Sequence, residues 1–362
     1  MLMDDYDPLK GRMLSILDKD GKVVEKGLEP KIDDALLVQA YKTMVLTRLA
    51  DEKAVRLQRQ GRLGAYPPTK GQEASQIGPA LALEKGDWMV WAFREMGALL
   101  LRGVPLWRLY LYWMGNEEGS VLEGDVNVTP SAVPVGSQVP HASGIAYAIK
   151  YRKEPKVALC YFGDGATSEG DFHEGLNLAG TMKLPAVFVC QNNQWAISVP
   201  RNMQTASPTL AQKACAYGFK GILVDGNDLL ALYAAAKEAI GRARRGEGPT
   251  LIESFTYRMG DHTTSDDATR YRSEEEIAYW TARDPLARLR AYLGHKGLWD
   301  ETNQKAWTEE AGRMVEEEVK KAEGHAPPTL DDVFVHTYAT MPASLKEQLE
   351  LHRSDLPARK EG

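Results

Sequence analysis

Two polar segments in the middle of the chain carry the residues best suited to chemistry. Asp164 stands between two glycines directly after the apolar run 157–162, and Asn193 follows the apolar run 186–190. Short, continuously apolar runs are typical of strands buried on both faces of a parallel sheet. Ligands of such sheets bind in the crevice at the carboxyl ends of neighbouring strands. We therefore expect Asp164 and Asn193 to converge on one site.

The residue types at this site favour a metal that is shared with a phosphate ligand. One carboxylate and one amide oxygen are too few for a calcium cage, but they suit Mg²⁺ completed by ligand phosphates. Gly163 and Gly165 allow close backbone approach, and a helix expected to begin near Ser168 would direct free N–H groups toward an anion. A Gly-Asp-Gly segment alone is also a common turn after a strand. A GxGxxG nicotinamide fingerprint is absent from this segment.

The elements that must position these residues alternate along the chain. Apolar runs at 157–162, 186–190, 222–224 and 250–252 are separated by amphipathic stretches of helix length. This order predicts an α/β fold with a parallel sheet flanked by helices. The stretch 36–116 has a helical pattern, with short helices and loops.

The ends of the chain have different patterns. Residues 1–35 resemble an extended arm with a hairpin turn at 18–21, and residues 308–323 are rich in Glu, Lys and Val. We therefore divide the chain of 362 residues into an N-terminal arm (1–35), an α/β domain (36–300) and a helical C-terminal extension (301–362).

The composition excludes several classes of protein. Apolar residues make up 43% and charged residues 26%, as in globular proteins, and the formal net charge of −6 argues against a polycationic nucleic-acid binder. No run of 18 apolar residues predicts a membrane span, and residues 4–7 include three aspartates where a signal peptide needs bases. Three cysteines without a CxxC pair predict neither disulfides nor zinc. We expect a cytoplasmic protein with no membrane contact.

The spacing of the two polar segments carries a family resemblance. Gly165 and Asn192 are separated by 26 residues, 166–191, and this GDG-to-NN pattern resembles the thiamine diphosphate motif. Residues 163–198 more specifically resemble the α subunit of the decarboxylating first component of 2-oxoacid dehydrogenase complexes. This resemblance implies a thiamine diphosphate-binding fold over 36–300, with thiamine diphosphate and Mg²⁺ as cofactors.

The resemblance also implies a metal site. Asp164 and the Asn193 side chain would bind Mg²⁺, the carbonyl of Trp195 would complete the protein's share, and Gly165 and Ala166 would meet the diphosphate. The family usually has tyrosine where this chain has Trp195. A main-chain ligand is retained despite that change.

Further cofactor contacts are implied by two other segments. In the segment 91–97, Arg94 would bind the diphosphate through charge-assisted hydrogen bonds, and Phe93 replaces a tyrosine, which removes one phosphate hydrogen bond. Val135 would prop the two cofactor rings into a bent conformation. Val133 stands near the cofactor where animal members often carry a hydroxyl at a potassium site, and this argues against potassium here.

A histidine is implied as the catalytic residue. His262 lies in a segment that resembles the family's active-site loop, and it would contact the diphosphate and assist acyl transfer to lipoamide, a role suited to the pKa of histidine. Without this context, a lone histidine among Thr and Asp is more often a surface residue. Four residues are expected to brace the loop: Arg258, Asp266, Tyr271 and Arg272.

The implied reaction is oxidative decarboxylation of a 2-oxoacid, with CO₂ released and the acyl group passed to a lipoyl group. The expected partners are a β subunit that supplies an essential carboxylate, in a heterotetramer of two α and two β chains, and a lipoyl acyltransferase core. Segments 60–66 and 71–76 resemble bacterial pyruvate dehydrogenase, whereas 262–280 resembles the branched-chain enzymes at least as closely. We favour pyruvate over 3-methyl-2-oxobutanoate.

A noncatalytic scaffold of the same fold is a second alternative. The joint presence of Arg94, Asp164, Asn193 and His262 argues against it.

Overall fold

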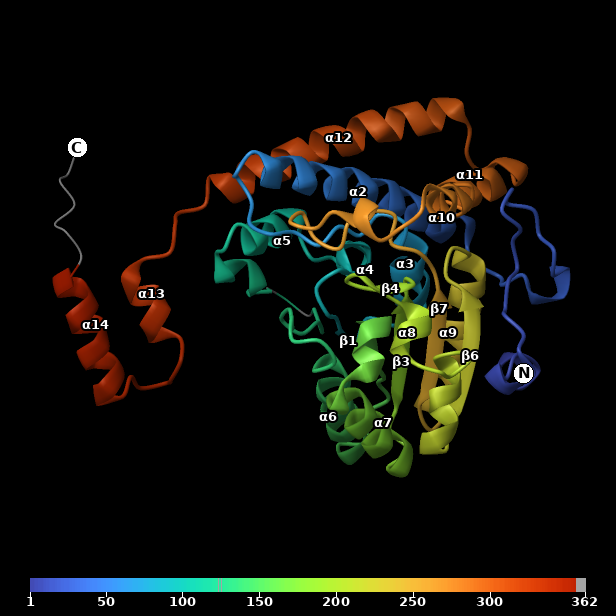
Figure 1. The fold of residues 1–362 in the computed structure, drawn as a ribbon, viewed down its shortest axis with the longest axis horizontal. Helices are drawn as coiled ribbons and strands as arrows, with labels where there is room; N and C mark the ends of the chain where they lie inside the picture. Colours follow the sequence, from blue (N-terminus) through green and yellow to red (C-terminus); the bar gives the residue numbers. More distant parts are fainter. Residues whose placement is uncertain (123, 125, 356–362) are drawn as a thin grey trace.

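A five-stranded parallel sheet forms the centre of the molecule (Figure 1). The computed structural model describes residues 1–122, 124 and 126–355, so residues 356–362 of the predicted extension lie outside the described part. Every neighbouring pair in the sheet is parallel, which confirms the α/β class. In spatial order the strands are β1 (Trp88–Val90), β2 (Ala158–Gly163), β3 (Ala186–Asn192), β7 (Thr250–Phe255) and β6 (Lys220–Asp225).

Four of the five strands coincide with the predicted apolar runs. The fifth, β1, lies within the stretch 36–116, for which a helical pattern was expected, and it pairs Trp88 with Ala158 of β2. Three residues are too few to show a strand periodicity, so this strand is formed by its tertiary pairing rather than by a local signal.

Helices cover both faces of the sheet, which explains why its strands are continuously apolar. Leu159 and Val187 pack into one core cluster, whereas their neighbours Cys160 and Phe188 pack into another on the opposite face. The first cluster includes α2 (Asp34–Arg59), α3 (Glu73–Leu81) and α9 (Leu229–Arg244), and the second includes α6 (Gln138–Tyr151) and α7 (Gly170–Thr181).

The buried cysteines behave as small apolar residues. Cys160 and Cys190 are fully buried and unpaired, and burial raises the pKa of both thiols. A raised pKa keeps a thiol protonated at neutral pH, so neither residue is a nucleophile. Cys215 is free and exposed.

The two edges of the sheet are covered by irregular segments. Leu14 makes a parallel bridge to Val224 on β6, and Val128 makes one to Met89 on β1. The arm also forms the expected hairpin, because Leu17 bridges to a residue beyond the turn at 18–21. Its short helices are α1 (Leu2–Asp5), η1 (Pro8–Lys10) and η2 (Lys26–Leu28).

Asp228 fastens the arm to the domain. One of its carboxylate oxygens accepts hydrogen bonds from the backbone N–H groups of Ile16 and Leu17, each at 2.6 Å. The other oxygen caps α9 by accepting from Leu230 and Ala231 at 3.0 and 3.1 Å. A single buried side chain therefore holds both the arm and a helix start.

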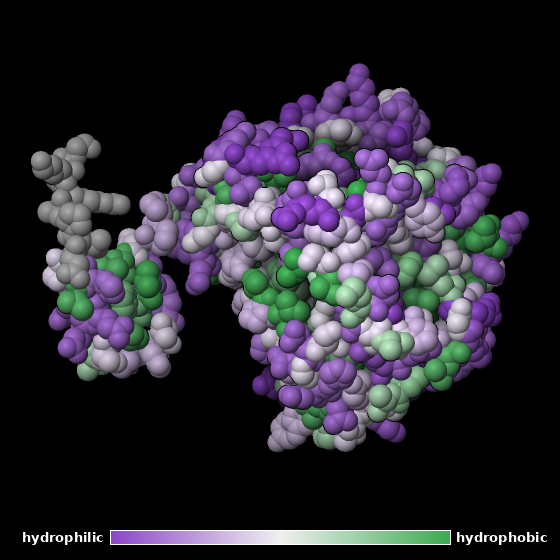
Figure 2. Space-filling view, in the orientation of Figure 1, coloured by the Kyte–Doolittle hydropathy of each residue, from purple (hydrophilic) through white to green (hydrophobic). Residues whose placement is uncertain are grey.

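The C-terminal part is helical, and α12 packs along α2 and α5 (Figure 1). Ser273 and Asp284 cap the helices that follow them. Beyond α12 the chain leaves the body, and α13 and α14 form a projecting lobe with apolar side chains on its surface (Figure 2). The helices are α10 (Glu274–Thr281), α11 (Pro285–His295), α12 (Glu301–Glu323), α13 (Leu330–Val335) and α14 (Ala343–Asp355).

Shorter elements complete the fold. They are α4 (Met96–Leu101), α5 (Leu106–Trp113), η3 (Glu117–Ser120), η4 (Asp164–Ser168), β4 (Trp195–Ala196), β5 (Val199–Pro200), α8 (Arg201–Gln204), η5 (Ala211–Tyr217) and η6 (Ala268–Arg270). In the described part of the chain, no helix combines the length and the apolar character needed to cross a bilayer.

Removing the Asp228 carboxylate should loosen the arm. Asp228→Ala abolishes a helix cap and leaves two buried N–H groups unpaired, so we expect the free energy of unfolding to fall by roughly 3 kcal/mol. Urea denaturation measures this loss, and hydrogen exchange should accelerate at Ile16 and Leu17. Asp33→Ala removes only the cap of α2 and serves as the control. Unchanged exchange at Ile16 and Leu17 in Asp228→Ala would contradict the role of Asp228.

Candidate active site

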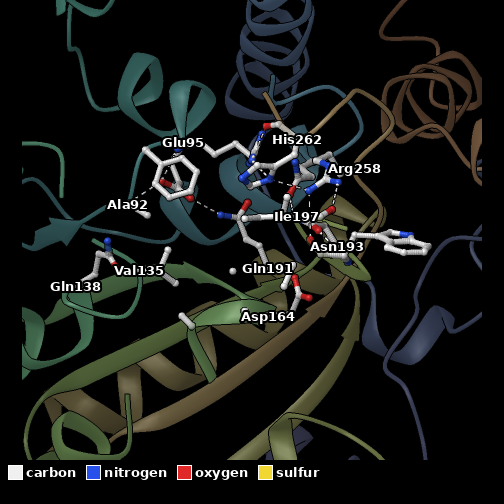
Figure 3. A pocket seen from close by; sticks show the side chains of 18 of the residues that line it. Ala92, Glu95, Val135, Gln138, Asp164, Gln191, Asn193, Ile197, Arg258 and His262 are labelled. Carbon is white, nitrogen blue, oxygen red and sulfur yellow. Dashed lines mark hydrogen bonds between the residues drawn. The ribbon is translucent and has the colours of Figure 1, made fainter. Parts of the chain in front are cut away.

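A cavity of about 250 Å³ lies at the carboxyl ends of β2 and β3 (Figure 3). Val133 does not line it, and its side chain is 50% exposed. The other residues predicted to bind cofactor or metal all line this cavity: Phe93, Arg94, Val135, Asp164, Gly165, Ala166, Asn193, Trp195 and His262.

The predicted metal ligands come from the ends of two neighbouring strands. Asp164 directly follows β2, and Asn193 directly follows β3. The register pairs Gly163 with Gln191, so the two segments leave the sheet side by side. The expected convergence is therefore confirmed. Residues 164–168 wind as a 3₁₀ turn, so the α-helix begins at Gly170 rather than near Ser168.

Asn193 is held by its neighbours in one orientation. Its side-chain nitrogen donates to Gln72 Oε1 at 3.0 Å, and its side-chain oxygen accepts from the backbone N–H of Trp195 at 3.3 Å. Because each amide atom has a matching partner, the Asn193 oxygen is fixed on the side that an oxygen-seeking cation could use.

The carboxylate of Asp164 is buried without an opposite charge. Its residue is 1% exposed, and no ion pair in the described part of the chain includes it. Burial raises the pKa of Asp164 accordingly. An unpaired buried charge is costly, and a cation at this carboxylate would offset that cost.

The donor set fits magnesium better than a transition metal. Within the described residues, no group of three or more His, Cys, Asp or Glu side chains could hold a metal. Any ion here must take Asp164 together with amide, carbonyl or ligand oxygens, which is the hard-oxygen environment that Mg²⁺ prefers. The Trp195 carbonyl accepts from Arg258 Nη1 at 3.2 Å and retains a second lone pair.

The backbone of the 3₁₀ turn lies close to the β4–β5 hairpin. A Cβ added to Gly165 would approach the Cβ of Ala196 to 3.0 Å, closer than ordinary contact. Glycine at this position thus permits close packing of the turn against the hairpin.

The opposite wall carries two buried guanidinium groups. Arg258 is fully buried and Arg94 is 6% exposed, and none of the ion pairs in the described part of the chain involves either residue. Both side chains approach His262, with Arg258 Nη1 and Arg94 Nη2 at 3.0 and 3.4 Å from its Nδ1 (Figure 3). Because neither guanidinium group forms an ion pair in the described part of the chain, both can bind an anion in the cavity.

These arginines determine the state of His262. Burial, followed by the charges of Arg94 and Arg258, lowers the pKa of His262 to about 3. Guanidinium groups only donate hydrogen bonds, so Nδ1 is the acceptor and Nε2 carries the proton. The sequence alone does not reveal this effect, because it does not show that both cations lie beside His262.

The loop around His262 is braced as expected. Asp266 accepts from the His262 backbone N–H at 2.8 Å and also bonds the Tyr271 hydroxyl. That hydroxyl accepts from Arg258 Nη2 at 3.1 Å, and Arg272 donates to the Arg258 carbonyl. These bonds connect the loop to the cavity wall.

A second carboxylate at the cavity was not predicted. Glu95 accepts from Gln191 Nε2 at 2.5 Å and from the backbone N–H groups of Ala92 and Arg94 at 2.9 and 3.2 Å (Figure 3). Burial raises the pKa of Glu95. Glu95 lies beside Arg94 in the recognised segment, and Gln191 directly precedes the asparagine pair, so proximity to these motifs was the available signal.

Other lining residues were also missed, among them Gln72, Gln138, Glu169 and Ile197. Gln72 orients Asn193, and Gln138 accepts from the Gly136 backbone N–H at 3.2 Å, which orders the loop that carries Val135. Ile197 has φ of 56°, an unfavourable conformation for a β-branched residue. Its carbonyl accepts from Arg258 Nη2 at 2.9 Å, and this bond helps to hold the conformation.

The fold and this site agree with the comparison to known proteins. The chain belongs to the dehydrogenase E1 component family, whose sequence model matches residues 41–331. The family resemblance of residues 163–198 is thereby confirmed.

Similar proteins are named pyruvate dehydrogenase E1 component subunit alpha. One from Acholeplasma laidlawii is 49% identical over 341 residues, which cover 94% of this chain and 99% of that protein. One from Staphylococcus aureus is 45% identical over 345 residues, which cover 95% and 93%. One from Staphylococcus epidermidis is 44% identical over 345 residues, which cover 95% of this chain and 93% of that protein.

The lowered pKa of His262 predicts how protonation affects the chain. As the pH falls through about 6.5, the unfolded chain binds a proton at this residue while the folded chain does not. Wild type should therefore lose stability relative to His262→Gln between pH 7 and 5, as measured by urea denaturation. Histidine NMR signals, assigned by comparison with the variant, should show neutral His262 down to pH 5. A titration midpoint near 6.5 would contradict this.

Proposed function

We propose that this chain is the α subunit of a dehydrogenase that decarboxylates pyruvate and passes the acetyl group to a lipoyl group. The observation that carries the proposal is that one cavity holds buried groups of both charges that form no ion pair. Among the residues described, none of the ion pairs includes Asp164, Arg94 or Arg258. A divalent metal bound to a diphosphate supplies partners of both charges. Relatives of 44–49% identity that bear the pyruvate name support the substrate.

We assign the cofactor contacts as follows. Asp164, the Asn193 oxygen and the Trp195 carbonyl would hold Mg²⁺. Thiamine diphosphate, when bound, supplies the carbon nucleophile and the electron sink for decarboxylation. The diphosphate would be held by the guanidinium groups, together with the backbone of the 3₁₀ turn. Four residues would make these contacts: Arg94, Arg258, Gly165 and Ala166.

His262 would act through its Nε2–H group. With Nδ1 held by two arginines, the protonated nitrogen is fixed as a hydrogen-bond donor. A neutral donor can contact an anionic group without adding charge, and it can stabilise negative charge that develops during acyl transfer. Val135, which lines the cavity and is 49% exposed, would prop the cofactor rings. Phe93 would line the site without a phosphate hydrogen bond.

A β subunit would complete the site. Apolar side chains that line the cavity are exposed: Ile197 is 57% exposed and Val135 is 49% exposed. Such side chains favour cover by another protein chain. The relatives are named as alpha subunits, which implies a β partner. We propose a heterotetramer of two α and two β chains docking on a lipoyl acyltransferase core.

We place the protein in the cytoplasm. Its three cysteines are free, and a reducing compartment suits unpaired thiols.

The assembled enzyme should use pyruvate. With the β chain, thiamine diphosphate and Mg²⁺, we expect reduction of an artificial electron acceptor, with kcat/KM for pyruvate at least roughly tenfold above that for 3-methyl-2-oxobutanoate, as a pocket difference of a few methylenes allows. Removing Mg²⁺ with EDTA should abolish the reaction. A preference for 3-methyl-2-oxobutanoate would assign the branched-chain function instead.

Two variants separate binding from acyl transfer. Asn193→Ala removes a metal ligand, so calorimetry should show cofactor affinity reduced at least roughly tenfold. His262→Ala should retain most of the affinity for cofactor and metal while acetylation of a lipoyl domain falls roughly a hundredfold, as for loss of a transition-state hydrogen bond. Equal loss of both functions in the two variants would contradict the assigned roles. Absence of Mg²⁺-dependent cofactor binding in wild type would favour the scaffold alternative.

A further inference from the structure

The carboxylate of Asp164 has one notable side-chain contact. Gln204, the last residue of α8, donates from Nε2 to Asp164 Oδ2 at 2.6 Å and to the Val199 carbonyl at 3.2 Å. Among the residues described, no other side chain donates a hydrogen bond to this carboxylate. The two residues lie 40 positions apart, so the fold and not the local sequence brings them together.

The orientation of the Gln204 amide follows from its surroundings. Gln204 Oε1 is buried and has no hydrogen-bond partner. Reversing the amide would place this oxygen against the carboxylate, and it would leave the nitrogen without either acceptor. The amide nitrogen therefore faces Asp164 despite the unsatisfied oxygen at the other end.

The backbone around α8 fixes where this amide lies. The N–H of Arg201, the first residue of α8, donates to the Gln194 carbonyl at 2.9 Å. The Arg201 guanidinium donates to the carbonyl of Thr205 at 3.4 Å and to that of Ser207. Both ends of the short helix are thus tied, and Gln204 is presented to Asp164 by a fixed segment.

We propose that Gln204 reserves one oxygen of Asp164 and thereby selects Mg²⁺ over Ca²⁺ at the cofactor site, an inference that rests on the proposed function. The amide hydrogen bond to Oδ2 competes with a cation for that oxygen, so coordination through Oδ1 alone is favoured. Gln204 is a specificity-determining residue that acts through Asp164 and does not itself bind the ion.

The two cations respond differently to this restriction. Ca²⁺ takes six to eight oxygen ligands and readily accepts both oxygens of one carboxylate, whereas Mg²⁺ requires a near-ideal octahedron. A carboxylate limited to one oxygen costs Ca²⁺ a ligand that it would otherwise gain. Mg²⁺ loses nothing by the same limit. The neutral amide also leaves the negative charge of Asp164 intact for the ion.

The test compares the two metals in the assembled complex with the β chain. Calorimetry in the presence of thiamine diphosphate would give the Mg²⁺ and Ca²⁺ affinities of wild type, Gln204→Ala and Gln204→Met. The methionine variant keeps the side-chain length and removes the N–H donor. We expect the Ca²⁺-to-Mg²⁺ affinity ratio to rise about tenfold in each variant, within the range seen for groups that orient metal ligands.

Two controls make the result specific. Gln212→Ala removes a nearby amide that donates to the Pro8 carbonyl at 3.2 Å, and it should leave the ratio unchanged. Asp164→Asn should weaken both metals. If wild type binds Mg²⁺ with the cofactor but the ratio changes less than about twofold in every folded Gln204 variant, the selectivity role is wrong. If wild type shows no metal-dependent cofactor binding, the proposed function itself fails.

Discussion

Buried charge that the chain does not neutralise by itself is the constraint on which the rest of this structure depends. Asp164 on one wall of the cavity and Arg94 and Arg258 on the other are held out of water without ionic partners among the residues described. Folding must supply the energy to hold them there. Packing of the helices on both faces of the sheet provides this free energy. A ligand that binds groups of both charges would add to the stability of the folded state.

Neutral amides surround these charges. Gln72 orients Asn193, Gln191 contacts Glu95, and Gln204 contacts Asp164. A charged partner in any of these positions would change the charge that a ligand must meet. An amide fixes the geometry and leaves the charge unchanged, and this explains why glutamine recurs around a site that must attract ions of both signs.

The sequence predicted the parts of the fold and site that follow from chain order. Continuous apolar runs indicated four strands, and Asp164 and Asn193 converge because parallel strands end at one edge. The sequence did not predict contacts that form only through tertiary packing. The strand β1 exists through its pairing with β2, and the pKa of His262 depends on Arg94, which lies 168 positions away. The family resemblance identified Arg94 and His262, but it did not indicate that the charge of Arg94 lowers the pKa of His262.

The covered edges of the sheet restrict how the molecule can assemble. Leu14 occupies the backbone hydrogen-bonding positions beside β6, accepting from Asp225 and donating to Leu223, each at 2.9 Å. Val128 likewise occupies a bridge position beside Met89 of β1. Neither edge can accept a strand from another chain at these positions, which protects the sheet against aggregation through strand addition. Extension of this sheet by a strand of another subunit is therefore blocked at these positions, and the sheet that positions the cavity keeps its five strands.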